Sequence, residues 1–114
     1  MRDIKFRYRI KNIRTEEIEK PILSLDEIQS GSYKYLFCKY YIVLSRDQFS
    51  ERYDKNGKEV YEKDILEYEG RKYLVDFCDG HFDGYAHGYF LLADVFRSSM
   101  IVGDIHENPE LLGE

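Results

Sequence analysis

Hydrophobic and polar residues alternate near the start of the chain. The hydrophobic positions are Ile4, Phe6, Tyr8 and Ile10, and the residues between them are basic. Because successive side chains of a strand point to opposite faces, this pattern predicts a strand over residues 2–11. We interpret its basic face as the exposed side of an edge strand; contact with nucleic-acid phosphates is the alternative. That face carries Lys5, Arg7, Arg9 and Lys11 and continues to Arg14.

Capping residues predict one short helix after this strand. Residues 12–22 are mostly charged and predict a loop. Ser24, followed three residues later by Glu27, matches a capping box, in which each residue satisfies a backbone N–H of the other. Gly31 suits the left-handed end of a helix. These positions predict a helix over residues 25–30.

The middle of the chain predicts a long strand and a turn. Aromatic and β-branched residues from Tyr33 to Leu44 favour the strand. Its better core face carries Leu36, Cys38, Tyr40, Ile42 and Leu44. Residues 45–53 are polar and ambiguous. Residues 54–57, Asp-Lys-Asn-Gly, predict a tight turn because Asn and Gly tolerate positive φ.

Turn residues divide the rest of the chain into short strands. We expect strands over residues 64–68 and 72–77, joined in a hairpin at Glu69-Gly70, and further strands over residues 89–94 and 100–106. Residues 78–88 contain three glycines and predict a loop or bulge. Asn108 and Pro109 predict a terminal turn, with Asn as its cap and Pro at its first position.

Together these elements predict a mainly β fold. The expected form is a small barrel-like antiparallel β domain with one or two short helices, because closure of a sheet leaves no exposed edge. A chain of 114 residues has the size of one domain, so residues 1–114 are expected to form a single domain. The aromatic content of 16% favours a Tyr-rich core, and an aromatic binding face is the alternative.

Charge is distributed unevenly along the chain. The net charge is −5, with +2 over residues 1–72 and −7 over residues 73–114. This acidity disfavours direct binding of duplex DNA, which needs a basic face. The acidic segment could attract a basic protein surface, or it could simply aid solubility. The candidate partner-binding residues are Asp79, Asp83, Tyr85 and Asp94.

The chain shows no sign of a membrane span or an export signal. Its apolar stretches are far too short to cross a bilayer, and charged residues directly follow Met1. Two cysteines do not make a disulfide framework, so a reducing compartment is expected. These features predict a cytoplasmic protein that does not associate with membranes.

Cys78, His81 and His87 have the spacing C-x2-H-x5-H, which suggests a zinc site. Thiolate and imidazole are ligands that Zn²⁺ prefers, and the nearby glycines allow tight turns. Asp83 or Cys38 would supply a fourth ligand. The alternative is a polar loop with an incidental thiol. We expect any such ion to be structural, because no phosphate-binding loop or convincing acid/base pair marks an enzyme.

Three segments, taken in order, resemble the YopX family. Residues 1–7 (MRDIKFR) open the chain, residues 54–66 (DKNGKEVYEKDIL) lie in its middle and residues 101–112 (IVGDIHENPELL) close it. The resemblance implies a β-rich fold with a small barrel-like body, a phage or prophage origin and no established enzyme activity. Lys63 stands where the family usually has Gly. Residues 49–53 replace its threonine-glycine step, and residues 12–50 show no clear match.

The resemblance and the acidity together predict a non-enzymatic phage accessory protein. We expect it to bind a host protein in the bacterial cytoplasm, as an inhibitor of host defence of the anti-CRISPR type. Such an inhibitor would block nucleic-acid loading or activation of a CRISPR effector nuclease, whose channel is positively charged. The alternative is a phage structural or assembly protein that works as a homo-oligomer. A metal-dependent hydrolase is a third hypothesis.

Overall fold

The computed structural model describes residues 4–31, 40–78 and 80–113. Strands predominate, so the predicted mainly β fold is confirmed. The chain divides into two compact units, residues 1–49 and residues 50–114. Its organisation as one domain stays a prediction.

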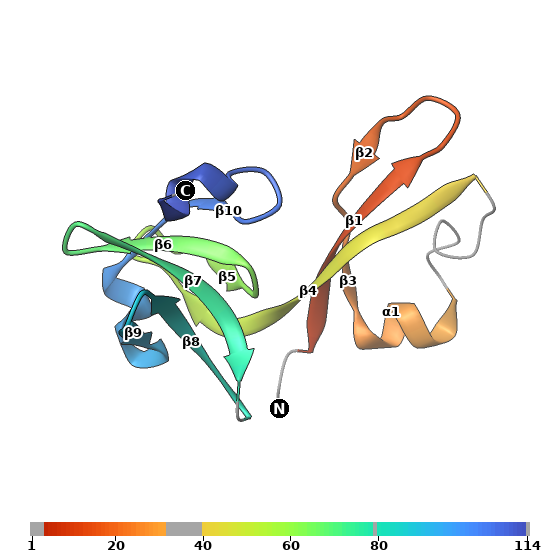
Figure 1. Ribbon diagram of the computed structural model, residues 1–114. Helices are drawn as coiled ribbons and strands as arrows, with labels where there is room; N and C mark the ends of the chain where they lie inside the picture. The colour runs from red at the N-terminus through yellow and green to blue at the C-terminus, as the bar shows by residue number, and fades with distance from the viewer. Residues whose placement is uncertain (1–3, 32–39, 79, 114) are drawn as a thin grey trace. The chain divides into compact units, whose positions relative to one another are not determined.

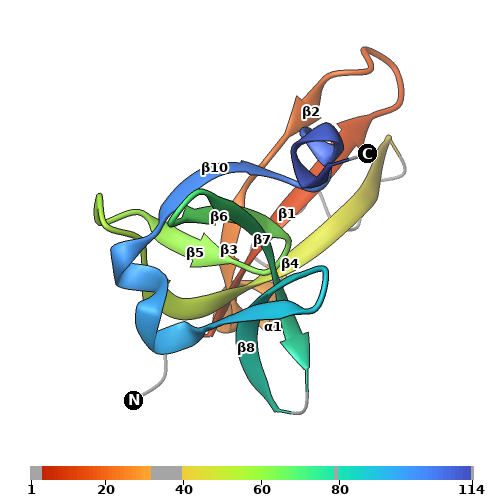
Figure 2. The ribbon, with the colours of Figure 1, turned by 60° about the vertical axis from the view of Figure 1, so that its left-hand side comes forward.

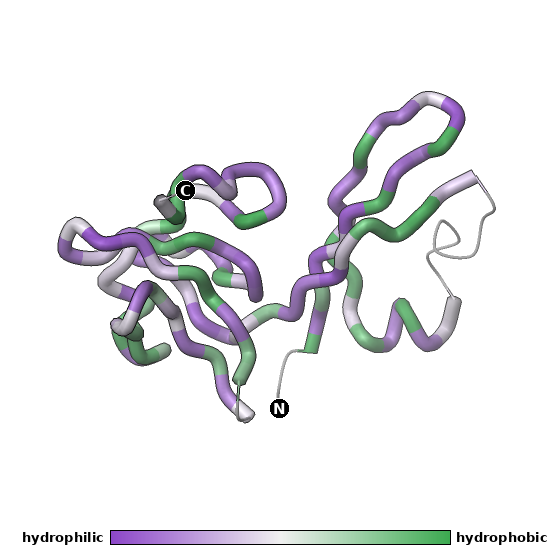
Figure 3. Tube along the Cα trace, viewed as in Figure 1, coloured by the Kyte–Doolittle hydropathy of each residue, from purple (hydrophilic) through white to green (hydrophobic). Residues whose placement is uncertain are grey.

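The first unit is built around β1 (Lys5–Asn12). This strand pairs antiparallel with β2 (Ile18–Glu19), with β3 (Ile22–Ser24) and with β4 (Tyr41–Tyr53) (Figure 1). Tyr8 and Ile10 are buried with Leu23 of β3, and the alternation of polar and apolar positions along β1 is visible in Figure 3. The predicted first strand is therefore confirmed from Lys5 to Lys11.

The helix α1 (Leu25–Ser30) begins and ends where the capping residues predict. Ser24 Oγ accepts a hydrogen bond from the Glu27 N–H at 3.1 Å, and Glu27 Oε1 accepts one from the Ser24 N–H at 2.8 Å. Gly31 has a φ of 73°, and its N–H is donated back to the helix. Both ends are thus fixed by local sequence alone.

The strand β4 differs from its prediction. Most of the predicted strand, residues 33–39, lies outside the described residues. β4 begins at Tyr41 and continues to Tyr53, through the polar stretch over residues 45–53 whose pattern is ambiguous. The predicted core face is wrong, because Tyr40, Ile42 and Leu44 are exposed. The buried part of β4 comes later, where Phe49 is buried and Asp47 is buried beside Arg7, at 3.3 Å.

The second unit contains an antiparallel sheet in the order β10-β6-β7-β8-β9. Its strands are β6 (Asp64–Tyr68), β7 (Arg71–Cys78), β8 (His81–Ala86), β9 (Tyr89–Leu92) and β10 (Met100–Asp104). They curl like half of a barrel, as Figure 2 shows. The short strand β5 (Glu59–Tyr61) is the neighbour of β4, and the Ser50 hydroxyl donates to the Val60 carbonyl oxygen at 2.6 Å.

Two predicted turns of this unit are confirmed. Gly57 has a φ of 79° in the turn that follows Asp54. Glu69 and Gly70 have φ values of 50° and 78°, so both central residues of the β6–β7 hairpin are left-handed, as two-residue hairpins favour. Lys63, just before β6, also has a positive φ of 73°.

The predicted loop over residues 78–88 is wrong, because most of it is the strand β8. Two of its glycines do make turns: Gly80 and Gly88 have φ values of 85° and 79°. Gly84 instead lies within β8, where a Cβ would stand 2.9 Å from the Cβ of Tyr73 and 3.3 Å from that of Leu91. A glycine is therefore needed at this position because there is no space for a side chain. Composition alone does not distinguish such a glycine from a glycine of a loop.

The core of the second unit lies on one face of the sheet. Its buried residues are Val60, Leu66, Tyr73, Val75, Phe82, Leu91 and Phe96. Phe96 belongs to a 3-10 helix, η2 (Ala93–Ser98), which follows β9. A second 3-10 helix, η3 (Pro109–Leu112), contacts β7.

The C-terminal turn is confirmed in part. Pro109 begins η3, as expected. Asn108 does not cap it, because its Oδ1 accepts a hydrogen bond from the Asp104 N–H at 3.3 Å instead. The side chain therefore closes the bend after β10. None of the described helices has the length and apolar character needed to cross a membrane.

Candidate functional site

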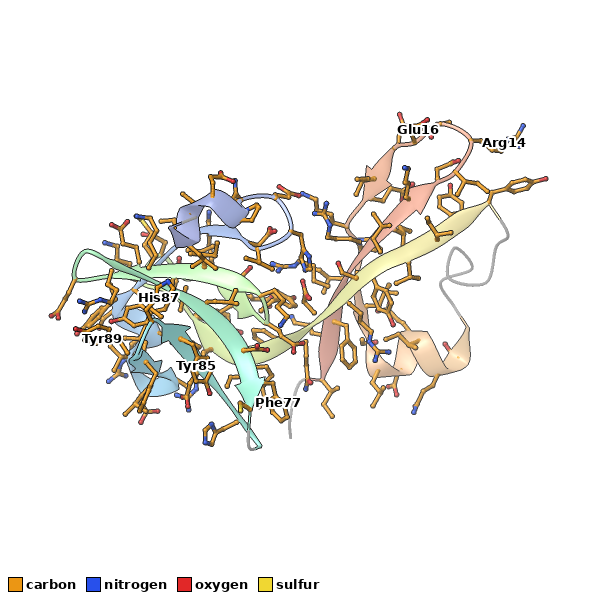
Figure 4. The ribbon with its side chains drawn as sticks, in the orientation of Figure 1. Arg14, Glu16, Phe77, Tyr85, His87 and Tyr89 are labelled. Carbon is orange, nitrogen blue, oxygen red and sulfur yellow. The ribbon has the colours of Figure 1, made fainter. Side chains whose placement is uncertain are left out.

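The structure does not bring the three predicted zinc ligands together. Cys78 and His81 are partners across the β7–β8 pair, at one end of these strands. His87 lies in the turn after β8, at the opposite end, and Figure 4 shows it far along the sheet from Phe77. Six residues of strand separate His81 from His87, which corresponds to roughly 20 Å, whereas a zinc ion needs its ligands within about 2.3 Å.

No group of three or more His, Cys, Asp or Glu side chains within the described ranges is placed to hold a metal ion. As placed, Cys78, His81 and His87 therefore do not fit one zinc ion. Zinc binding stays a prediction, and Cys78 with His81 is the pair that the hairpin brings together.

The carboxylates beside this pair already have partners. Asp83 Oδ2 lies 3.1 Å from His81 Nδ1, and Asp83 Oδ1 accepts a hydrogen bond from the Ala93 N–H at 3.3 Å. Asp76, directly opposite Asp83 on β7, pairs with Lys63 Nζ at 3.1 Å. Each of the two carboxylates thus has its own side-chain partner. We interpret these groups as structural: Asp83 ties β8 to the start of η2.

Of the four candidate partner-binding residues, the three that the structure describes do not form one surface. Asp79 lies outside the described residues, and Asp83 is buried. Asp94 is exposed on η2 and pairs with Arg52 at 3.0 Å. Tyr85 lies elsewhere, on the face of the sheet opposite the core, where it lines a groove.

This groove is the most distinctive feature of the second unit. Leu74, Tyr85 and Phe90 are neighbours across β7, β8 and β9, and they share the outer face of the sheet. The rings of Tyr85 and Phe90 have centroids 6.5 Å apart. Ile105 and Leu112, before and within η3, line the other side. Between them is an open groove of about 670 Å³.

The strand β9 borders the groove and is the last strand of its sheet. Tyr89, Phe90 and Leu92 have exposed fractions of 54%, 65% and 56%. Figure 3 shows a hydrophobic stretch here, continuing into η2. Proteins usually protect an edge strand with charged residues, a proline or a bulge. The sequence Tyr-Phe-Leu-Leu has neither charge nor proline, and such exposed apolar surface marks a site of interaction.

The charged residues that line the groove are all basic. Lys72 lies at the groove, and Arg71 lines an adjoining hollow that shares Lys72, His87 and Tyr89 with it. The Arg71 guanidinium lies over the Tyr89 ring, 3.8 Å from its centroid. Neither hollow has an Asp or Glu among its lining residues in the described part of the chain. The groove is therefore mainly apolar and aromatic, with Lys72 and no carboxylate among its described lining residues.

Sequence reasoning missed most of this site. It selects Tyr85, but neither Phe90 nor Leu74, because both fit ordinary strand positions. One signal was available: residues 89–92 are four consecutive apolar residues, whereas a half-buried strand alternates. The groove itself depends on η3 returning to the outer face, which no local pattern indicates.

Comparisons with known proteins agree with this fold. The crystal structure of protein EF1440 from Enterococcus faecalis is similar, with a TM-score of 0.51 and 19% sequence identity over 94% of this chain and 97% of that chain. At this identity the likeness concerns the fold alone. A search of curated proteins gave no match.

A sequence profile described as YopX protein matches residues 7–113. The match begins at residue 7, so it leaves out most of residues 1–7, the opening segment on which the resemblance was based. It also includes residues 12–50, where the sequence alone showed no clear similarity, so that expectation is corrected. Since the profile spans nearly the whole chain, the protein belongs to the YopX family of small phage and prophage proteins.

Proposed function

We propose that this protein is not an enzyme and that it acts by binding a host protein through β9 and the adjoining groove. The observation that carries the proposal is the row of exposed apolar side chains on an unprotected edge strand. Tyr89, Phe90 and Leu92 expose more than half of their surface. Burying such side chains against a partner is favourable by about 25 cal/mol per Å² of apolar surface. Aromatic residues in particular are enriched at interfaces.

The ionisable groups of the second unit support a binding role over a catalytic one. The imidazole of His81 is held by Asp83, and Lys63 pairs with Asp76. Both contacts join side chains of the second unit to one another. The groove, in contrast, is lined mainly by apolar and aromatic side chains, which suit recognition more than proton transfer.

A narrower proposal concerns the partner. Membership in a phage family and the charge of −7 over residues 73–114 favour a host defence protein with a basic nucleic-acid channel. A CRISPR effector nuclease is a partner of this kind. Asp94 on η2 supplies an exposed carboxylate close in sequence to β9. In this arrangement the apolar strand would provide affinity, and the acidic residues would orient the two proteins.

Affinity capture with matched variants tests the proposed surface. The wild-type protein and the double variant Phe90→Ser/Leu92→Ser are immobilised and exposed to lysate of the bacterial host. The control is Ile13→Ser, which replaces an apolar residue with an exposed fraction of 49% in the first unit. We expect one host protein to be retained by the wild type and the control and to be lost from the double variant. Retention by all three proteins contradicts the proposal.

A plasmid-interference assay tests the narrower proposal. Expression of the wild-type protein in a host with an active CRISPR system should restore plasmid uptake, and the double variant should not. The homo-oligomer alternative predicts a different result: the immobilised chain would retain chiefly added copies of itself. Its specific support is the same unprotected edge of β9, which could pair with a second copy.

A further inference from the structure

We propose that Cys78 and His81 form half of a tetrahedral zinc site, which the same two residues of a second copy of this chain complete. One ion would thus join two chains through two thiolates and two imidazoles. The pair lies at the end of β7 and β8 that is opposite the groove, so the site shares no residue with the surface of the proposed function. Either proposal can fail without the other.

The β7–β8 hairpin brings the two ligands to one face of the sheet. Cys78 ends β7, His81 begins β8, and the two residues are directly opposite each other. Opposite residues of an antiparallel pair point to the same face, with Cβ atoms about 4.5–5.5 Å apart. Zinc bond lengths of about 2.3 Å to sulfur and about 2.0 Å to nitrogen place these two atoms about 3.5 Å apart in a tetrahedron. Two side chains that start this close can therefore reach one ion.

Asp83 holds the imidazole of His81 in the form that a metal ion requires. Asp83 Oδ2 lies 3.1 Å from His81 Nδ1, so the proton of the neutral ring stays on Nδ1 and Nε2 keeps its lone pair. Histidines that bind zinc usually have such a carboxylate behind them, which fixes the tautomer and the orientation of the ring. Among the described residues, neither Nε2 of His81 nor the thiol of Cys78 has a partner of its own.

Both ligands are accessible to a second molecule. The side chain of His81 is 63% exposed, and Cys78 is exposed as well. The side chain of Asp83, in contrast, is 12% exposed, which suits a group that orients the imidazole without binding the ion itself. Figure 1 shows the ends of β7 and β8 projecting beyond β6 and β9. The pair is therefore placed to bind an ion that another chain shares.

The need for four ligands points to a second copy. In the described part of the chain, no third His, Cys, Asp or Glu joins the pair in a metal-binding group. Asp83 uses its other oxygen, Oδ1, to accept the Ala93 N–H at 3.3 Å, and Asp76 is paired with Lys63. A structural zinc site is closed by four protein ligands. A two-fold contact between identical chains places the same residues of both against each other, so it doubles the pair into a Cys2His2 set.

Zinc titration with analytical ultracentrifugation tests the site. The full chain is stripped with EDTA, kept under reducing conditions and given Zn²⁺ alone. We expect a dimer that binds about one ion per two chains and dissociates when EDTA is added again. Co²⁺ in place of Zn²⁺ should give the intense visible absorption of a tetrahedral ion together with a thiolate charge-transfer band, because the ligand set determines the geometry.

Four variants assign the ligands. Cys78→Ser and His81→Ala should each abolish the zinc-dependent dimer, whereas His87→Ala should not, since His87 lies beyond the other end of β8. Asp83→Asn should weaken zinc binding about 10–100-fold, because an amide can donate to Nδ1 and move the ring proton to Nε2. Asn keeps an oxygen for the Ala93 N–H, and the NMR spectrum of each metal-free variant checks that it is folded.

Three results overturn the inference. One is a zinc-bound monomer that loses its ion in Cys38→Ser, because Cys38, which lies outside the described residues, would then supply a ligand within the chain. Another is a chain that stays monomeric in Zn²⁺, or a zinc-dependent dimer that Cys78→Ser leaves unchanged. The third is a dimer that persists in EDTA and is lost in Phe90→Ser, which assigns self-association to the edge of β9. Capture of a host protein through β9 is a separate measurement, and none of these results decides it.

Discussion

The carboxylate of Asp54 connects the turn at residues 54–58 to β10 by accepting a hydrogen bond from the Ile101 N–H at 3.1 Å through Oδ2. Its Oδ1 accepts two more hydrogen bonds, from the N–H groups of Asn56 and Lys58, at 2.8 and 2.9 Å. Asp54 is 4% exposed. One buried side chain therefore satisfies three backbone donors from two distant parts of the chain.

Replacing Asp54 should destabilise the protein. We expect Asp54→Asn to lower the free energy of unfolding by about 1–3 kcal/mol, because hydrogen bonds to a charged acceptor are stronger and an amide offers only one oxygen for three donors. The control is Asp94→Asn at an exposed carboxylate, which should change stability by less than about 0.5 kcal/mol. Urea denaturation at pH 7 measures both. Equal stability of the two variants would show that the buried contacts contribute nothing.

The same residue predicts a dependence on pH. Burial raises the pKa of Asp54, but the N–H donors of Ile101, Lys58 and Asn56, together with the charge of Lys58, outweigh it and hold the pKa below its usual value. A folded-state pKa below that of the unfolded chain adds stability that is present above the unfolded pKa and lost as the pH falls through the folded one. The stability difference between wild type and Asp54→Asn should therefore shrink below about pH 4. Urea denaturation across pH 2–7 follows it; a constant difference contradicts the assignment.

Gly84→Ala should destabilise the second unit by overpacking. The new methyl group would stand 2.9 Å from the Tyr73 Cβ, so the strands must separate, at a cost of about 1–3 kcal/mol. The control is Gly57→Ala, which meets no atom within 4 Å but has a φ of 79° and should cost about 1 kcal/mol through its backbone alone. Thermal denaturation compares them, and the Tyr73 resonances should shift only in Gly84→Ala. Unchanged Tyr73 resonances would argue against the steric contact.

Lys63 provides a test of backbone strain. Its φ of 73° is unfavourable for a residue with a Cβ. Lys63→Ala and Lys63→Gly both remove the contact with Asp76, but only Gly relieves the strain. We expect the Gly variant to be more stable than the Ala variant by about 1 kcal/mol, as measured by urea denaturation. The reverse order would show that Lys63 is not strained.

Any zinc retained by the purified protein should depend on Cys78 and His81. These residues are direct partners across β7 and β8, whereas His87 lies beyond the far end of β8. Elemental analysis should therefore show less zinc in Cys78→Ser and in His81→Ala, and unchanged zinc in His87→Ala. Loss of the ion from His87→Ala as well as from the other two variants would favour the original set of three ligands over this placement.

The elements that the sequence predicted well are those fixed by local chemistry. The helix α1 has its capping box at Ser24 and Glu27 and its left-handed end at Gly31, and each contact lies within a few residues. The hairpin at Glu69-Gly70 similarly needs only positive φ at two positions. Such signals are independent of tertiary structure, so they can be read directly from the chain.

The elements that were missed depend on tertiary contacts. Asp47 looks like a surface residue until Arg7 from a distant strand is placed beside it. Gly84 suggests a loop until Tyr73 is known to lie against it. The groove combines both difficulties, because Tyr85 and Leu112 are brought to one face only by the returning η3. The periodicity of hydrophobic residues does not indicate polar pairing, steric limits or the path of the chain.

The connectivity of the second sheet also implies an order of events during folding. β6, β7, β8 and β9 follow one another as hairpins, so each pairing closes only a short loop and has a small entropic barrier. β10 is different, because it follows η2 in the chain and pairs with β6, the earliest of these strands, with Ile101 opposite Leu66. Low contact order speeds folding, and distant pairings slow it. The four consecutive strands β6 to β9 should thus pair first. The docking of β10, with its hydrogen bond to Asp54, should then complete the unit.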